Sequence, residues 1–168
     1  MMRKIALLFD GTWNNTQDGT NVVRLRDSID SSGRDDPMRP CYYDTGVGTQ
    51  WHDRLTGGLF GRGLSRNIRQ GYEWLCKKYQ TGDQLFVAGF SRGAYTARSL
   101  VGMIRKCGLL NSSDETHIGQ AYELYRNKDI APDDLPAKTF RAQHAREIRV
   151  RFIGVWDTVG TLGVPIGN

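Results

Sequence analysis

Cysteine is scarce in this sequence and is not arranged as metal or disulfide sites require. The sequence contains three cysteines, Cys41, Cys76 and Cys107, which lie far apart and form no C-x-x-C pair. This spacing argues against a zinc site and against the disulfide framework of a small secreted protein. We therefore expect reduced, inert thiols.

Long apolar segments are missing as well. The basic start of the chain followed by an apolar run resembles a signal peptide, but Asp10 ends that run after five residues. The core of a signal peptide and a membrane-spanning helix are both longer than this. The sequence thus predicts a soluble, cytoplasmic protein, and any export would have to use a route that reads no N-terminal signal.

The excess of positive charge is modest. The chain carries 23 basic and 18 acidic residues, which gives a formal net charge of +5. That balance favours anionic surfaces such as phospholipid, and it is too small to indicate a nucleic-acid partner. The length suits a single domain over residues 1–168, and no internal repeat is visible.

The most informative stretch is the pentapeptide Gly89-Phe-Ser-Arg-Gly93. Residues 85–88 before it form a continuous apolar run typical of a buried parallel strand, and residues 94–104 after it have helical spacing. Ser91 therefore stands where a strand becomes a helix, in a turn that needs small residues on both sides. This is the context of the G-x-S-x-G nucleophile elbow of α/β-hydrolases.

Such an elbow lifts the serine hydroxyl above the sheet edge and places a helix amino terminus beneath the reacting carbonyl. We predict Ser91 as the nucleophile and the amide of Arg92 as the first donor to the oxyanion. The alternative is that Ser91 only caps the helix, for which serine is a preferred residue. The two flanking glycines favour the nucleophile, because a simple cap does not need them.

The first apolar run, Lys4–Phe9, predicts a buried strand that opens into the polar loop Asp10–Asn15. In open α/β sheets, ligands bind at the carboxyl edge where such loops lie. In α/β-hydrolases a loop after an early strand gives the second amide of the oxyanion hole. We therefore predict that Gly11 and Thr12 have this role.

Other interpretations of this loop stay open. Asp10 and Asn14 could simply close an Asx turn. Asp10 and Asp44 could instead hold a metal ion for phosphoester hydrolysis, although carboxylates without a histidine partner are weak evidence for a metal. The Phe-Asp-Gly-Thr sequence also resembles the first motif of haloacid-dehalogenase phosphatases, but Leu8 occupies the position of their nucleophile.

Helices and strands alternate along the rest of the chain. We expect a helix at 21–29 capped by Asn21, a strand at 41–43, a glycine-rich loop at 57–63, helices at 64–79 and 113–125, and a weak helix or lid at 140–147. The glycine-rich loop lacks the G-K-[ST] of a phosphate-binding loop and is read as a lid or substrate-entry loop. The basic side chains of helix 64–79 are read as a solvated face, with contact to a membrane surface as the alternative.

A strand predicted at 148–156 ends in Asp157. In α/β-hydrolases the triad acid follows a strand later than the elbow strand, and the chain order is serine, acid, histidine. Asp157 has this order and location, so we predict that it orients the imidazole and stabilises its charged form. The alternative is a strand-end aspartate that caps the next turn.

The catalytic base is missing from this pattern. Serine needs a base within hydrogen-bonding reach, but His52, His117 and His144 all precede Asp157. We infer that the base lies beyond the last residue of this chain. The expected fold is an α/β-hydrolase-like three-layer sandwich with a mostly parallel sheet, incomplete at the C-terminus.

Four stretches together resemble a known family. They are residues 8–15, 43–48, 89–98 and 152–160, which read LFDGTWNN, YDTGVG, GFSRGAYTAR and FIGVWDTVG. They look like the uncharacterised α/β-hydrolase domain family that includes the type VI secretion system phospholipase effectors. The resemblance implies a Ser-Asp-His lipase or esterase in which Ser91 and Asp157 match the nucleophile and the acid.

These observations lead to one leading hypothesis and one rival. The leading hypothesis is a serine hydrolase that cleaves carboxylic esters of phospholipids or other lipids without a metal or other cofactor. Its expected partners are the lipid or ester substrate, a membrane surface, and a secretion-system or immunity protein. The rival is a catalytically inactive binding or adaptor module that retains the fold.

Overall fold

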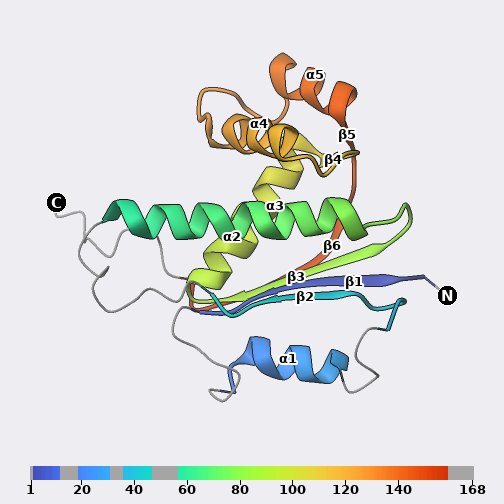
Figure 1. Ribbon diagram of the computed structural model, residues 1–168, viewed down its shortest axis with the longest axis vertical. Helices are drawn as coiled ribbons and strands as arrows, with labels where there is room; N and C mark the ends of the chain where they lie inside the picture. Colours follow the sequence, from blue (N-terminus) through green and yellow to red (C-terminus); the bar gives the residue numbers. More distant parts are fainter. Residues whose placement is uncertain (1, 12–18, 31–35, 47–56, 159–168) are drawn as a thin grey trace.

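A parallel sheet of four strands forms the centre of the molecule (Figure 1). The computed structural model describes residues 2–11, 19–30, 36–46 and 57–158. Side chains are described for all of these residues except residue 30 and residues 57–62. The strands are β1 (Lys4–Phe9), β2 (Cys41–Asp44), β3 (Gln84–Phe90) and β6 (Val150–Trp156), in the order β2-β1-β3-β6. The prediction of an α/β fold with a mostly parallel sheet is confirmed.

The central strands are apolar on both faces. Leu7 and Leu8 of β1 point to opposite sides of the sheet, and each is at most 1% exposed. This pattern is expected of a parallel strand that is covered on both sides. β1 pairs in parallel with β2 and β3, and its last residue, Phe9, lies opposite Gly89. The strands therefore end together at one edge of the sheet.

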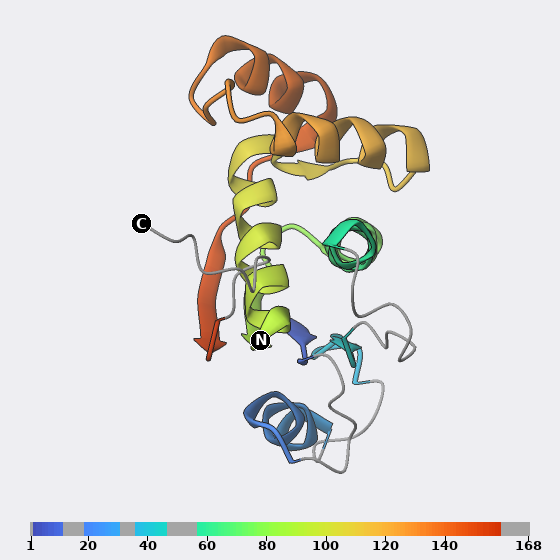
Figure 2. The same cartoon turned by 90° about the vertical axis from the view of Figure 1, so that its left-hand side faces the viewer.

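Helices cover both faces and give three layers (Figures 1 and 2). The helices α2 (Gly57–Lys78) and α3 (Arg92–Cys107) lie on one face, and α1 (Asn21–Asp30) lies on the other. The larger core lies under α2 and α3, where Tyr72 and Leu100 pack against β1 and β3. Val22 of α1 packs against the opposite face of the same strands.

A helical unit follows α3 in the chain. It consists of α4 (Glu115–Arg126), α5 (Leu135–His144) and a short antiparallel pair, β4 (Leu109–Leu110) with β5 (Ala145–Arg146). Figures 1 and 2 show this unit at the top of the molecule, beyond α2 and next to the carboxyl end of α3. Tyr72 joins it to α2, because its buried hydroxyl donates to the carbonyl of Gly108 at 2.8 Å.

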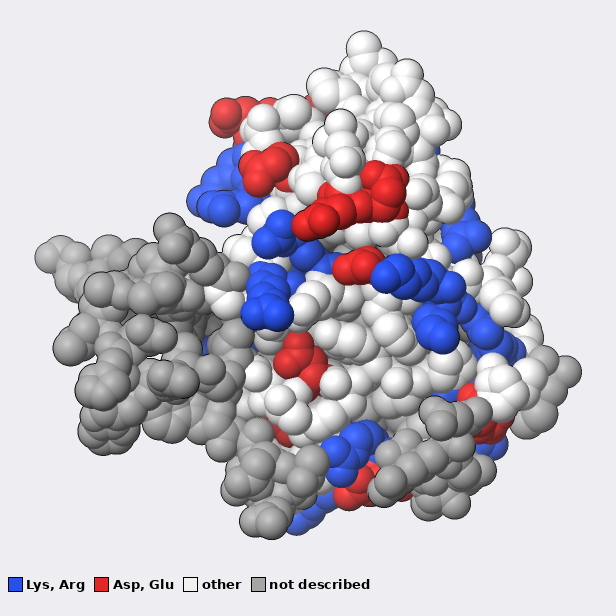
Figure 3. Space-filling view, in the orientation of Figure 1, with Lys and Arg blue, Asp and Glu red and all other residues white. Residues whose placement is uncertain are grey.

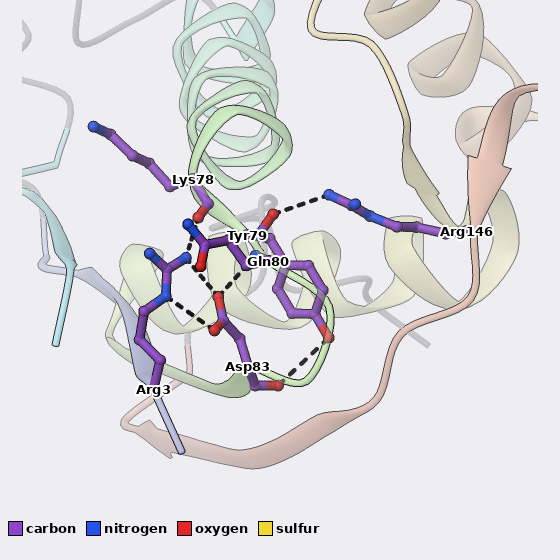
Figure 4. A network of polar contacts seen from close by, with 6 residues as sticks. All are labelled: Arg3, Lys78, Tyr79, Gln80, Asp83 and Arg146. Atoms are coloured by element: carbon purple, nitrogen blue, oxygen red, sulfur yellow. Dashed lines mark hydrogen bonds and ion pairs between the residues drawn. The ribbon is translucent and has the colours of Figure 1, made fainter. Parts of the chain in front are cut away.

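An ion-pair network fixes the amino edge of the sheet (Figure 4). The guanidinium of Arg3 donates from Nε to Asp83 Oδ1 at 2.9 Å and from Nη2 to Asp83 Oδ2 at 2.7 Å. The amide of Gln80 also donates to Asp83 Oδ2, at 2.8 Å. Burial alone would raise the pKa of the Asp83 carboxyl, but these hydrogen bonds hold that pKa below its ordinary value.

Several sequence predictions of local structure need correction. The glycine-rich segment predicted as a loop at 57–63 belongs to α2, which begins at Gly57. The cap of α1 is Thr20 rather than Asn21, because the Thr20 hydroxyl accepts from the amide of Val23 at 3.1 Å. The helix expected from residue 140 begins earlier, at Leu135.

The outer face of α2 carries charge of both signs. Its exposed basic residues include Arg66, Arg69 and Lys77, and Lys77 forms an ion pair with Glu73 at the i, i+4 spacing. Figure 3 shows basic and acidic side chains interspersed on this side of the molecule. Such mixed charge is typical of a solvated helix face. Among the residues that the structure describes, no helix is long and apolar enough to cross a membrane.

Candidate active site

Ser91 occupies a strained turn between β3 and α3. Its backbone angles are φ 55° and ψ −117°, in a region that residues with a side chain rarely adopt. A Cβ added to Gly89 would lie 2.3 Å from the carbonyl oxygen of Gly93, and one added to Gly93 would lie 2.1 Å from the carbonyl oxygen of Phe9. Both glycines are therefore required by close backbone contacts, as the pentapeptide indicated.

The side chain of Ser91 does not cap α3. The Ser91 carbonyl accepts from the amides of Ala94 and Tyr95 at 3.1 and 3.3 Å, but its hydroxyl makes no capping hydrogen bond. Capping of α3 therefore does not explain why Ser91 adopts these strained backbone angles. Strain of this kind gathers at functional sites, where the surrounding structure enforces it.

Arg92 is the first residue of α3, so its amide lies at the positive end of the helix. An oxyanion next to Ser91 would face this end. Burial of the Arg92 side chain lowers the pKa of its guanidinium.

Asp157 directly follows β6, the strand that pairs with β3 just before Ser91. Phe90 of β3 is the register partner of Trp156 of β6, and the amide of Ser91 donates to the carbonyl of Trp156 at 2.9 Å. Asp157, which is exposed, follows Trp156 with a φ of 45°. Among the described residues, Ser91 and Asp157 are the two with positive φ that are not glycine. Ser91 directly follows Phe90 and Asp157 directly follows Trp156, and these two residues are paired at the same sheet edge.

The end of β1 touches the other side of the elbow. The Cα of Gly93 packs so closely on β1 that an added Cβ would also lie 2.6 Å from the carbonyl oxygen of Asp10. The amide of Gly11 donates to Oδ1 of Asp10 at 2.8 Å. Gly11 therefore cannot offer this hydrogen to an oxyanion in the same conformation. Thr12, the other predicted donor, lies outside the described residues.

Asp10 is a structural centre of this edge. Its side chain accepts from the hydroxyls of Thr20 and Tyr43 at 2.8 and 2.9 Å, both through Oδ2. This arrangement was not visible in the sequence, because Thr20 and Tyr43 lie on separate elements and no spacing rule joins them to Asp10. The Asx turn suggested with Asn14 lies outside the described residues.

The alternative of a metal-dependent phosphoesterase gains no support from the carboxylates themselves. Both oxygens of Asp10 already accept hydrogen bonds from protein groups. Asp44 accepts from the amide of Gly46 at 2.8 Å, and burial raises the pKa of its carboxyl. Within the described ranges, no three histidine, cysteine, aspartate or glutamate side chains are grouped as metal ligands.

Two of the three histidines lie far from Ser91. The amide of Asn111 donates to the carbonyl of His144 at 3.0 Å, which places His144 beside the carboxyl end of α3. Ser91 precedes the amino end of that helix of 16 residues, roughly 24 Å away at the usual rise. His117 stacks on His144 with ring centroids 5.0 Å apart, so it shares this location. His52 lies outside the described residues.

A three-layer α/β domain with a strained serine between its central strand and the following helix defines an α/β-hydrolase-like protein. The family model of the type VI secretion system phospholipase effector Tle1-like catalytic domain matches residues 3–168. The chain belongs to this family. The resemblance inferred from the four motifs is thus confirmed.

The chain is similar to uncharacterized protein YEL023C of Saccharomyces cerevisiae, with 31% identity over 188 residues. The match takes in 96% of this chain and 27% of the yeast protein, so the chain spans about a quarter of the length of that relative. No solved structure matches the chain.

Proposed function

We propose that this chain carries the nucleophile and the acid of a serine hydrolase that cleaves carboxylic esters of phospholipids or other lipids. The observation that carries the proposal is that Ser91 and Asp157 directly follow Phe90 and Trp156, which are paired in the sheet. Ser91 and Asp157 both have left-handed backbone angles, both follow paired residues of neighbouring strands, and both lie at the edge where α/β sheets bind ligands. Membership of a phospholipase effector family supports the lipid substrate.

In the proposed reaction, Ser91 Oγ attacks the ester carbonyl and forms an acyl-enzyme as the alcohol leaves. A histidine takes the serine proton and passes it to the leaving oxygen, while Asp157 holds the imidazole in the productive tautomer. The amide of Arg92 stabilises the oxyanion together with the amide of Thr12, since the Gly11 amide donates to Asp10. Water then hydrolyses the acyl-enzyme, and no step requires a metal or other cofactor.

We propose that the base is a histidine outside this chain, because His52, His117 and His144 all precede Asp157 and α/β-hydrolases have the order serine, acid, histidine. Neither His117 nor His144 can reach Ser91 from the far end of α3 without unfolding the helical unit. The proposed partners are a membrane lipid as substrate and, by family membership, a type VI secretion component or an immunity protein. By family membership, we propose that the protein is made in the cytoplasm and exported by a type VI secretion system.

The test is covalent labelling of the complete gene product with a fluorophosphonate, followed by peptide mapping. We expect one adduct on Ser91, none in Ser91→Ala, and full labelling in the control Ser112→Ala, whose hydroxyl forms hydrogen bonds with the exposed carboxylate and the amide of Asp114. Asp157→Asn should lower kcat for a phospholipid ester by about 10³–10⁴. A complete gene product that neither labels at Ser91 nor hydrolyses any ester would instead favour the binding or adaptor module.

A further inference from the structure

Asp10 is a buried carboxylate with an unusually full set of donors. Its exposed fraction is 1%, although it directly follows a strand at the ligand-binding edge of the sheet. Burying a carboxylate costs free energy unless hydrogen bonds compensate for the lost water. Asp10 accepts from the Gly11 amide through Oδ1 and from the Thr20 and Tyr43 hydroxyls through Oδ2.

These donors come from three separate parts of the fold. Gly11 belongs to the segment after β1, Thr20 caps α1, and Tyr43 lies on β2. Burial, and then the hydrogen bond to Asp10, raise the pKa of the Tyr43 phenol, so the phenol stays protonated and remains a donor. One carboxylate thus joins β2, α1 and the end of β1.

The backbone at this point is held from both sides as well. The amide of Asp10 donates to the carbonyl of Asp44 at 2.8 Å. An added Cβ on Gly46, which has a φ of 82°, would lie 2.9 Å from the carbonyl oxygens of Asp10 and Gly11. On the other side, Gly93 of the elbow packs against the same stretch. The Asp10–Gly11 backbone is therefore enclosed between the end of β2 and the helix that carries Ser91.

We propose that Asp10 is a positioning residue for the reaction at Ser91. Its buried carboxylate fixes the Asp10–Gly11 backbone against the elbow and thereby sets the direction in which the chain leaves β1, next to the oxyanion. Asp10 takes no part in the chemistry, since its oxygens are occupied by protein donors. This inference rests on the proposed function, and it adds a residue that acts through the geometry of the site.

Tyr43→Phe is the sharpest test, because it removes one donor to Asp10 and keeps the ring. The matched control is Tyr42→Phe, the same change on the same strand, at a side chain that packs on the opposite face against Phe9 and Trp74. A misplacement of about 1 Å near a reacting centre costs on the order of 100-fold in rate. For the smaller shift expected here, we predict that Tyr43→Phe lowers kcat roughly tenfold.

The measurements are kcat and KM for an ester substrate, and the affinity for a trifluoromethyl ketone, which forms a hemiketal oxyanion with a serine nucleophile. We expect Tyr43→Phe, but not Tyr42→Phe, to lower kcat and weaken this inhibitor in parallel while KM stays unchanged. Thr20→Val should lower kcat and inhibitor affinity in the same way, and it should also lower the melting temperature because the Thr20 hydroxyl caps α1.

Two results would overturn the inference. One is equal kcat and inhibitor affinity in Tyr43→Phe and Tyr42→Phe, and the other is a lowered melting temperature in Tyr43→Phe with kcat unchanged at a temperature where both proteins are folded. A wild-type protein that neither hydrolyses esters nor binds the ketone would be a different failure. It would reject the proposed function, and the role of Asp10 with it.

Discussion

Replacing Gly93 by alanine tests the elbow more directly than any change to Ser91, because it alters the geometry and leaves the proposed reacting groups chemically unchanged. A Cβ at this position would lie 2.1 Å from the Phe9 carbonyl oxygen and 2.6 Å from that of Asp10, whereas real Cβ contacts under 3.0 Å essentially do not occur. The obstructing atoms are backbone atoms at the carboxyl end of the central strand β1. They cannot turn aside as a flexible side chain could.

The size of the expected losses in stability and labelling rate follows from this obstruction. The amino end of α3 would have to move away from β1 by about 1 Å, which is severe overpacking and should destabilise the fold by about 3 kcal/mol or more. In urea denaturation this corresponds to a midpoint lowered by about 1–2 M. The same displacement would move Ser91 relative to β1, so fluorophosphonate labelling should slow by about 100-fold where the protein is still folded.

Gly119 provides the matched control. It lies inside α4, and nothing is within 4 Å of an added Cβ. Gly119→Ala should therefore stabilise the protein by about 0.5–1 kcal/mol and leave labelling unchanged, because alanine is the better helix former. If Gly93→Ala retained both the urea midpoint and the labelling rate of the wild type, the close packing of Gly93 on the backbone of β1 would be refuted.

Two further predictions concern the Arg3–Asp83 ion pair at the amino edge of the sheet and His144, which lies too far from Ser91 to act as its base. The pKa of Asp83 is lowered in the folded state, so the stabilisation from its bonds with Arg3 is present above the unfolded pKa and is lost as pH falls through the folded pKa. Asp83→Asn should thus lower the urea midpoint at pH 7, and the difference from wild type should shrink as pH falls below about 4, the ordinary pKa of an aspartate. A difference that is constant with pH would contradict this. His144→Ala should leave the labelling rate of Ser91 unchanged, and a large loss of labelling in a folded variant would show that the helical unit reaches the site.

Much of the fold could be predicted because the sheet strands are locally distinct. The apolar run Lys4–Phe9 coincides with β1, and residues 85–88 lie within β3, because a buried parallel strand needs continuous apolar sequence. Glycine at 89 and 93 likewise indicated the sharp turn. In each case the information lies within a few neighbouring residues.

The features that were not predicted depend on information that a few neighbouring residues do not contain. Glycine disfavours helices, so residues 57–63 were predicted as a loop, yet α2 includes them. β4 and β5 have two residues each, too few for any periodicity to be recognised. The side-chain hydrogen bonds of Asp10 join residues up to 33 positions apart, and no local pattern encodes such a pairing.

The amino edge of the sheet carries the Arg3–Asp83 ion pair, and the carboxyl edge carries the proposed active site. The strand register connects the two edges. At the amino edge, the Gln84 amide donates to the carbonyl of Arg3 at 3.0 Å, directly beside the Arg3–Asp83 ion pair. This contact begins the register that ends with Phe9 opposite Gly89 at the other edge. A slip of one residue would turn every side chain of β1 to the wrong face. It would also move the backbone on which the elbow packs, so the ion pair at one edge helps to set the position of the serine at the other.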